Sequence, residues 1–206
     1  NEGGLRFKEQ CFEWSCAMDS GGIAKAGMGV AAADVDDDAD IDLLVVNLVR
    51  QSDSFFRNEG TYFVDATSQV GISPVSVRHT RFGVPFADFD NDGRLDLYEV
   101  NGRVEMQEPA QGDGFAEPNA LLQGSMTDKG LSFEEVKPRG GTFPVLVHTS
   151  RGLAVGDVDN DGGRDLVITN RDAAPYLLMN TVANDDPGKA RDLGNWVRFR
   201  VSTGIR

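Results

Sequence analysis

One acidic block is written three times in this chain, and it constrains the fold more than any other feature. The copies read GVAAADVDDDADIDLLVVN over residues 29–47, GVPFADFDNDGRLDLYEVN over 83–101 and GLAVGDVDNDGGRDLVITN over 152–170. They align without a gap, with glycine first, asparagine last and aspartate at four shared positions between them. Self-similarity of this kind is the signature of a repeat architecture.

Short apolar runs adjoin each block and predict β-strands. The runs are Leu43-Leu44-Val45-Val46, Leu97-Tyr98-Glu99-Val100 and Leu166-Val167-Ile168. Runs of this length, bounded by glycine and asparagine, are typical of strands, so each acidic block is expected to join two of them. A weaker second block follows each copy, in Phe55-Phe56-Arg57-Asn58, Leu121-Leu122-Gln123 and Tyr176-Leu177-Leu178-Met179-Asn180. About four strands per repeat predict an all-β protein, a β-propeller in which each repeat is one blade.

The repeats divide the chain into segments. Asn1 to Phe7 is similar to Asn58 to Phe63 with one extra residue, so we expect the chain to begin inside a repeat. About three and a half blades would not close a ring, so we expect a segment of a longer protein, or one that needs partner chains. The expected division is 1–28 for the end of a preceding blade and a linker, 29–82 for the first repeat, 83–151 for the second with an inserted surface loop at 107–119, and 152–190 for the third.

Five of nine positions in each acidic block offer oxygen ligands to a metal ion. In the pattern D-x-D-x-D-G-x-x-D, the side chains at positions 1, 3, 5 and 9 and the carbonyl of position 7 can converge on one centre, and hard oxygen donors suit Ca²⁺. Glycine at position 6 permits the positive-φ turn that folds the loop around the ion. The predicted ligands are Asp34, Asp36, Asp38, Asp40 and Asp42 in the first loop, Asp88, Asp90, Asp92, Arg94 and Asp96 in the second, and Asp157, Asp159, Asp161, Gly163 and Asp165 in the third, with Asp40, Arg94 and Gly163 binding through the backbone carbonyl.

The pattern predicts about three calcium ions per chain, of which the first is the weakest. Ala39 stands where the other two loops have glycine, and an alanine at positive φ costs on the order of 1 kcal/mol. A helix–loop–helix site is ruled out in two copies, because its position 12 glutamate is replaced by Val45 and Ile168. The flexible all-oxygen loop favours calcium and leaves Mg²⁺ and Mn²⁺ as alternatives.

The bland alternative is that the aspartates form solvated turns, which aspartate favours in any case. The charge balance argues for cations instead. The chain has 33 acidic and 20 basic residues, for a net charge of −13, and without the twelve shared aspartates only 21 acidic residues remain. Four carboxylates crowded together repel strongly unless a cation is bound, so metal binding and folding are expected to be coupled.

Two cysteines and two tryptophans carry weaker signals. Cys11 and Cys16 fit either a local disulfide of an exported protein or two reduced thiols, and their spacing matches no zinc or haem motif. Trp14 and Trp196 could form a sugar-stacking surface, although core packing is the commoner fate of tryptophan. The chain contains no G-x-S-x-G, no H-E-x-x-H and no phosphate-binding glycine loop with lysine.

Histidine and asparagine recur at equivalent places in the repeats. His79 and His148 precede corresponding segments, so a structural role at a repeat position is favoured over a paired catalytic one. Asn47, Asn101 and Asn170 close the acidic blocks, and we expect their amides to cap strand ends or bond turn backbone.

These blocks resemble FG-GAP/VCBS repeats, the integrin-α-like propeller repeat, and Arg81-Phe82-Gly83-Val84-Pro85 resembles its Phe-Gly-x-Pro variant. Together with Arg57-Asn58, Gly71-Ile72 and Asn195-Trp196-Val197-Arg198-Phe199, they resemble the CRTAC (cartilage acidic protein)/ASPIC–UnbV group. The resemblance implies a secreted or cell-surface, calcium-dependent propeller, usually seven-bladed. It also implies that residues 191–206 begin an ASPIC/UnbV-like segment.

Three functions remain open. The leading expectation is a non-enzymatic, calcium-binding extracellular module for protein or glycan interaction and adhesion, with structural Ca²⁺. The alternatives are the propeller domain of a secreted polysaccharide lyase or hydrolase, and a structural subunit of an extracellular assembly whose neighbouring chains complete the ring. The net negative charge argues against nucleic acid as a partner, and no apolar run approaches the roughly 20 residues that span a membrane. We expect a secreted, cell-surface or periplasmic protein.

Overall fold

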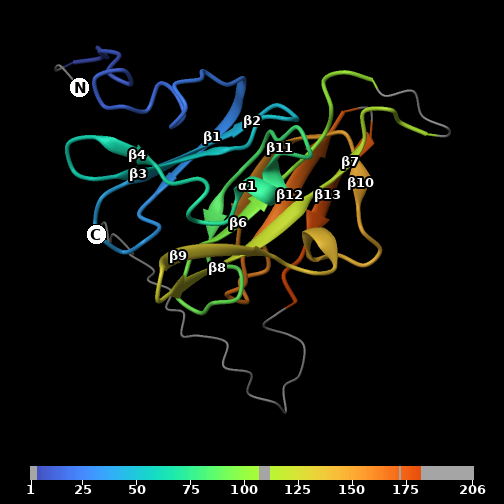
Figure 1. Cartoon of the computed structure of the whole chain (residues 1–206). Helices are drawn as coiled ribbons and strands as arrows, with labels where there is room; N and C mark the ends of the chain where they lie inside the picture. The colour runs from blue at the N-terminus through green and yellow to red at the C-terminus, as the bar shows by residue number, and fades with distance from the viewer. Residues whose placement is uncertain (1–3, 107–111, 172, 182–206) are drawn as a thin grey trace.

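The structure of this chain, a computed structural model, describes residues 4–106, 112–171 and 173–181. It is built from antiparallel sheets, and the strands of the three larger sheets follow one another in chain order (Figure 1). The first sheet contains β1 (Gly27–Ala33), β2 (Asp42–Asn47), β3 (Ser54–Asn58) and β4 (Phe63–Asp65); the second contains β5 (Phe86–Ala87), β6 (Asp96–Glu99), β8 (Ala120–Thr127) and β9 (Gly130–Glu135); the third contains β11 (Ser150–Gly156), β12 (Asp165–Asn170) and β13 (Ala173–Leu178).

Short elements connect the sheets. A one-turn helix, α1 (Ser73–Ser76), lies between the first and second sheets in the chain, and a 3₁₀ turn covers Arg139–Gly141. The strands β7 (Glu117–Pro118) and β10 (Val147–His148) pair with each other in a separate two-stranded ribbon. The predicted all-β fold is therefore confirmed, and so are the three predicted apolar strands, which lie in β2, β6 and β12. A propeller is consistent with these sheets, whereas the number of blades and the closure of a ring stay predictions.

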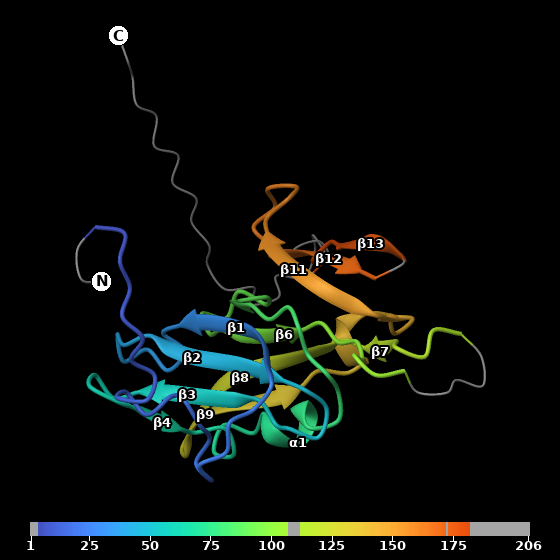
Figure 2. The same ribbon diagram turned by 90° about the horizontal axis from the view of Figure 1, so that it is seen from above.

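The sheets lie against one another (Figure 2). Two clusters of buried apolar side chains form the cores between them. Between the first and second sheets, Leu44 and Val46 of β2 meet Leu97 and Leu122. Between the second and third sheets, the aromatic ring of Tyr98 and the side chain of Val100 meet Leu166 and Ile168. Because side chains alternate between the two faces of a strand, β6 contributes to both cores and is buried on both faces.

The glycines that open the first two repeats are needed for close packing of the sheets. A β-carbon on Gly29 would overlap the carbonyl oxygen of Phe82, which immediately precedes the second repeat, and one on Gly83 would lie 2.7 Å from the β-carbon of Leu153. No side chain fits at either position, so the glycine lets the first strand of one sheet approach the next.

The segment before β1 differs from the expectation for residues 1–28. Residues 4–26 form turns and no strand, so no strand of a preceding blade is seen in this described part. They cross the first sheet instead. The ring of Trp14 packs 6.1 Å from that of Phe63, whose N–H donates to the Trp14 carbonyl at 2.8 Å. The side chain of Trp14 thus packs against the first sheet. Cys11 and Cys16 carry free thiols.

The predicted inserted loop at 107–119 ends in buried side chains. Residues 107–111 lie outside the described residues, whereas Glu117 and Asn119 are buried. Glu117 accepts a hydrogen bond from the Thr80 N–H at 2.9 Å, and the Asn119 side-chain oxygen accepts one from the Asn101 N–H at 2.9 Å. The end of the insertion is therefore structural, because its side chains bond the backbone of the neighbouring strands. The other predicted segment boundaries stay predictions.

Candidate metal centres

Each acidic block forms the connection of a β-hairpin, as its length predicts. The ninth residue of each loop begins the second strand and pairs with the residue just before the first aspartate. These pairs are Ala33 with Asp42, Ala87 with Asp96, and Gly156 with Asp165. Because the three registers are the same, the three loops present their carboxylates from equivalent positions.

The loops share two residues with left-handed backbone. The sixth position has φ of 72° at Ala39, 89° at Gly93 and 96° at Gly162. Ala39 thus adopts the conformation that glycine favours, and the first loop forms at a cost of about 1 kcal/mol. The fourth position is also left-handed, at Asp37, Asn91 and Asn160. Aspartate and asparagine tolerate this region better than other non-glycine residues do.

The carboxylate of the first aspartate stabilises the turn by accepting hydrogen bonds from backbone N–H groups of the same loop. Asp34 accepts hydrogen bonds from the N–H groups of Asp38 at 3.1 Å and Ala39 at 3.0 Å. Asp88 accepts the equivalent pair from Asp92 and Gly93. The fifth residue in turn accepts from the seventh at 2.8 Å in all three loops, so Asp38, Asp92 and Asp161 each stabilise the backbone that follows them.

The ninth aspartate is fixed by a residue outside the loop. Asp42 accepts hydrogen bonds from the backbone N–H groups of Val35 at 3.3 Å and Asn58 at 2.8 Å. Gly124 is the outside donor to Asp96, and Asn180 is the outside donor to Asp165, at 2.9 and 2.8 Å. The sequence reasoning did not assign a role to these donors. Their signal was present in the weaker second block, which ends at or just before each of them.

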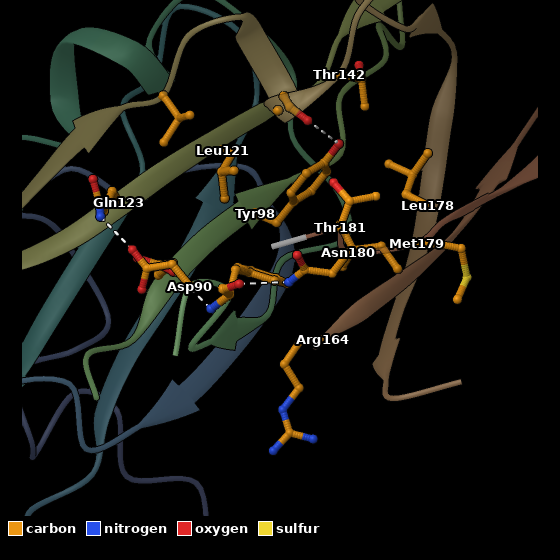
Figure 3. Close-up of a pocket in the computed structure, with 16 residues that line it drawn as sticks. Asp90, Tyr98, Leu121, Gln123, Thr142, Arg164, Leu178, Met179, Asn180 and Thr181 are labelled. Carbon is orange, nitrogen blue, oxygen red and sulfur yellow. Dashed lines mark hydrogen bonds between the residues drawn. The ribbon is translucent and has the colours of Figure 1, made fainter. Parts of the chain in front are cut away.

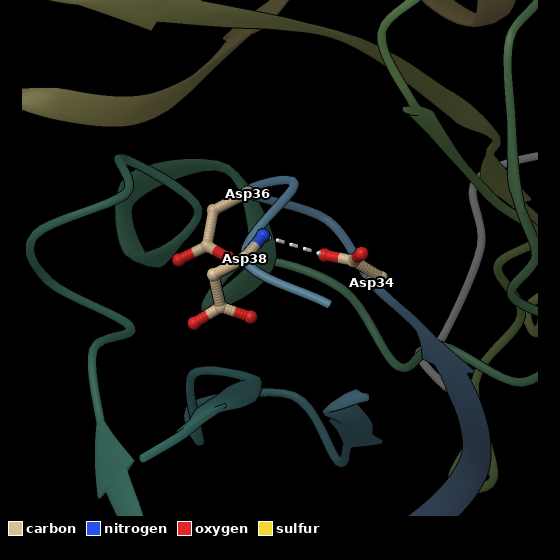
Figure 4. Close-up of side chains that lie close together, drawn as sticks. All are labelled: Asp34, Asp36 and Asp38. Atoms are coloured by element: carbon tan, nitrogen blue, oxygen red, sulfur yellow. Dashed lines mark hydrogen bonds between the residues drawn. The ribbon is translucent and has the colours of Figure 1, made fainter. Parts of the chain in front are cut away.

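Three carboxylates converge in every loop, although the set differs. Asp34, Asp36 and Asp38 converge in the first loop (Figure 4). The second loop brings together Asp88, Asp90 and Asp96, and the third brings together Asp157, Asp159 and Asp165. In each set the ligand oxygens lie within 4.8 Å of one another. Oxygens on opposite sides of a bound Ca²⁺ are separated by about 4.6–5.2 Å, because Ca–O distances are 2.3–2.6 Å.

The remaining predicted ligands lie outside these sets. Asp42 is absent from the first set, and Asp92 and Asp161 are absent from the second and third. Their oxygens accept the backbone hydrogen bonds described above, which leaves lone pairs for an ion. They stay predicted ligands, as do the carbonyl oxygens of Asp40, Arg94 and Gly163.

Burial and mutual repulsion disfavour the ionised form of several of these carboxyls. Burial raises the pKa of Asp42 to about 6, with the charges of Asp36 and Asp38 adding to the rise. Burial likewise raises the pKa of Asp96 to about 7, with Asp90 and Asp92 adding. The pKa of Asp90 is also raised, first by burial and then by Asp92. A bound cation would reverse this, because an opposite charge favours ionisation.

The residues present fit a calcium ion. All donors are oxygen, and Asp36 has a buried oxygen, Oδ1, with no hydrogen-bond donor from the described protein. A divalent ion there would neutralise the crowded carboxylates and fix the hairpin connection. In the first loop the positive charge of Arg57 would compete with this ion for Asp36. Arg57 lowers the pKa of Asp36, although burial has the larger effect and raises it.

Neighbouring loops contact one another. The guanidinium of Arg94 in the second loop forms an ion pair with Asp37 in the first. The side-chain amide of Asn180, which follows β13, donates to the carbonyl of Phe89 in the second loop at 2.7 Å. The first and second loops are therefore each held by a contact from the following repeat as well as by their own sheet.

A cavity of about 320 Å³ opens beside the second loop, between the second and third sheets (Figure 3). Its wall is largely apolar, with Tyr98, Leu121 and Leu178 among the lining residues. Asp90 lies at its edge and accepts a hydrogen bond from the Gln123 amide at 2.7 Å. The Asp90 carboxylate is thus hydrogen-bonded to a neighbouring side chain, and the cavity offers mainly apolar contact.

The two histidines lie in different surroundings. His79 is half-buried, with its Nδ1 atom 3.2 Å from Nη2 of Arg139. Burial, followed by the charge of Arg139, lowers the pKa of His79 to about 4. His148 packs its ring edge-on against Tyr176, with 5.3 Å between the centroids. These contacts are those of packed structural residues.

The three closing asparagines behave as predicted. The amide of Asn47 donates to the Ser52 carbonyl at 2.9 Å, that of Asn101 to Pro118 at 2.7 Å, and that of Asn170 to Ala174 at 2.9 Å. Each bonds the backbone that leads into the next strand of its sheet. Trp196, like the rest of the segment 191–206, lies outside the described residues.

Residues 34–99, which include the first two loops, match the model of a family described as FG-GAP-like repeat. No curated protein matches the chain at a significant level. The match supports the interpretation of the acidic blocks as repeats of this kind. The finer assignment to the CRTAC/ASPIC–UnbV group stays a prediction. Among the described residues, no helix has both the length and the apolar character to cross a bilayer.

Proposed function

We propose that this chain is a calcium-binding β-propeller module that acts outside the cell by binding a protein or a glycan, and that its calcium ions are structural. The observation that carries the proposal is the threefold recurrence of one hairpin loop, with three converging carboxylates in every copy. The match of residues 34–99 to the FG-GAP-like repeat model supports it further, because such repeats are typical of extracellular interaction modules.

The ions would act by neutralising charge at the connections between strands. The loop aspartates account for nearly all of the excess of acid over base, and burial opposes their ionisation at Asp42 and Asp96. Since ligands must be deprotonated to bind, calcium affinity and folding stability are linked. A partner would then meet a rigid surface whose loops do not rearrange.

A non-enzymatic role is favoured over polysaccharide cleavage by the state of the acidic side chains. Asp90 at the cavity edge is bonded by Gln123, and Asp96 accepts two backbone hydrogen bonds. Carboxyls engaged in this way suit the support of a loop better than transfer of a proton to substrate. His79 and His148 contact different partners, Arg139 and Tyr176.

The test is a thermal melt with and without EGTA, together with the metal content of the untreated protein. Three calcium ions per chain and a large fall in Tm with EGTA are expected. Two ions would identify the first loop as the defective one. An Asp88→Asn variant should lose one ion, whereas the control Asp128→Asn, in an exposed turn between β8 and β9, should keep all three. If the protein holds no metal and its Tm does not change with EGTA, the proposal is wrong and the aspartates form solvated turns.

A further inference from the structure

Three buried charged side chains join the first and second sheets at the strand ends remote from the aspartate loops. Arg81, Asp53 and Glu99 have exposed fractions of 0%, 0% and 1%. Glu99 is the last residue of β6, whose first residue is the loop aspartate Asp96. Asp53 immediately precedes β3, whose last residue, Asn58, contacts the first loop.

The same positions at the other junction carry no charge. Ser150 takes the place of Arg81, because both donate their backbone N–H to the closing asparagine of the preceding sheet. Asn119 takes the place of Asp53, because both accept the N–H of a closing asparagine. Ile168 takes the place of Glu99, three residues after the ninth aspartate. A buried charged cluster is therefore a special feature of the first junction and needs its own explanation.

The guanidinium of Arg81 has no hydrogen left for Glu99. Its Nε and Nη2 atoms contact Oδ1 of Asp53 at 2.6 and 2.5 Å, and Nη2 also donates to the Gln51 carbonyl at 2.8 Å. Its Nη1 donates to the carbonyls of Ser76 and His79. These contacts use all five N–H groups of an arginine. Arg81 therefore neutralises one carboxylate, that of Asp53.

Glu99 and the second oxygen of Asp53 have no donor among the described residues. Both oxygens of Glu99 and Oδ2 of Asp53 are buried without a hydrogen-bond partner that donates to them, and the two side chains lie within hydrogen-bonding reach of each other. Two ionised carboxylates in this position would repel each other and remain undersolvated, at a large free-energy cost. One proton between them supplies the missing donor.

We propose that the Glu99 carboxyl is protonated and donates its O–H to Oδ2 of Asp53, so that a shared proton links the first two sheets. The cluster then carries one negative charge on Asp53 and one positive charge on Arg81. Burial, followed by the negative charge of Asp53, raises the pKa of Glu99 well above its usual value, in agreement with this geometry. The other charged or titratable groups near the pair are Lys25, His79, Glu117 and Arg139.

A shared proton makes the junction sensitive to pH. A carboxyl whose pKa is raised by folding contributes its full stabilisation below its unfolded pKa of about 4.5, and this is lost as the pH rises through the folded value. Over that window the unfolding equilibrium constant should rise by up to about tenfold per pH unit, since one proton is involved. Above it, two negative charges would face one arginine across the junction.

The test compares the 206-residue chain with Glu99→Gln in saturating calcium, which keeps the loop carboxylates ionised. Glutamine is nearly isosteric and supplies a permanent N–H donor to Asp53. Measured by denaturant unfolding from pH 5 to pH 9, the stability of the wild type should fall with pH relative to that of Glu99→Gln, because titration of His79, whose pKa is lowered to about 4, affects both proteins alike. The ratio of their unfolding constants should therefore change by at least tenfold. The control Glu134→Gln, at an exposed site on β9, should follow the wild type.

A variant-independent measurement guards against a misfolded Glu99→Gln protein. Infrared difference spectroscopy of the wild type at pH 7 should show the C=O band of a buried neutral carboxylic acid, and ¹³C NMR of the glutamate carboxyls should show one that titrates late. A ratio of unfolding constants that is constant with pH would overturn the proposal. So would a Glu99 carboxyl that is ionised at pH 7, or a stability that depends on added cations instead of pH.

Discussion

The first and second aspartate loops share one backbone and differ in their neighbours. Both have left-handed residues at the fourth and sixth positions, but the sixth is Ala39 in the first loop and Gly93 in the second. Arg57 faces Asp36 in the first, whereas the neutral Gln123 bonds Asp90 in the second. The comparison teaches that an identical ligand pattern does not imply an equal site, because adjacent side chains set the strain and the local charge.

The largest expected effect is a difference between the first and second loops in how much each makes stability depend on pH when calcium is absent. With EGTA present, stability should fall as the pH rises from about 4 to about 7, because Asp96 has its pKa raised from 3.8 to about 7 and must ionise while buried. A shift of that size corresponds to as much as about 4 kcal/mol. Asp96→Asn should flatten the dependence of stability on pH more than Asp42→Asn does, because the pKa of Asp42 is raised only to about 6. Chemical denaturation at several pH values measures both, and an equal flattening would contradict the difference between the loops.

The next effect concerns the aspartate that holds each turn. Asp88→Ala removes a ligand and leaves the Gly93 N–H without its acceptor, whereas the Asp92 N–H keeps its hydrogen bond to Asp90, so the free energy of unfolding in calcium should fall by about 2–3 kcal/mol. Asp34→Ala should cost less, because we expect the first loop, with Ala39 at positive φ, to bind its ion more weakly. The melts of both variants, with Asp128→Ala as the control, check the order; a larger loss for Asp34→Ala would reverse the ranking of the sites.

A glycine in the first loop should make it resemble the second. Ala39→Gly relieves a backbone strain of about 1 kcal/mol, and the calcium affinity of the first site should rise about fivefold. Gly93→Ala is the reciprocal variant and should weaken the second site by a similar factor. Isothermal titration calorimetry of the two proteins resolves the change, and the idea fails if the affinities of the two variants move in the same direction.

The smallest expected effect comes from the charge near Asp36. Arg57→Gln introduces the residue found at the equivalent position of the second repeat. It removes the positive charge of the guanidinium near the first site, together with the ion pair to Glu59. Calcium affinity of that site should rise about twofold at low salt, as expected for a partly exposed charge. The gain should shrink in 1 M NaCl, where such charges are screened, and a gain that persists there would point to a steric cause.

Much of this molecule was predictable because its sequence repeats itself. Three gapless copies gave the positions of β2, β6 and β12 and the hairpin loops between strands, and Ala39 was expected at positive φ before its angle of 72° was known. The role of Asn47 and its equivalents also followed from their position. A repeat transfers information between copies, so a residue that recurs in register carries a common structural demand.

The rest could not be predicted where a residue acts across sheets or has no equivalent in another copy. The insertion ending at Glu117 occurs once, and nothing in the local sequence shows that its side chain bonds Thr80. Trp14 lies in a segment without an equivalent in another copy, and its packing against Phe63 of the first sheet could not be read from a repeat. The buried cluster of Arg81, Asp53 and Glu99 joins residues from distant parts of the chain, which no local pattern brings together.

The contacts made by Asn180 have a mechanical consequence. Its backbone N–H holds the last aspartate of the third loop, while its side chain holds the Phe89 carbonyl in the second. A force applied along the chain from residue 181 would therefore load two hairpins at once, before either could peel away alone. Under tension, the second and third sheets should detach as one unit with a single rupture, whereas an alanine at position 180 should divide that event into two weaker steps.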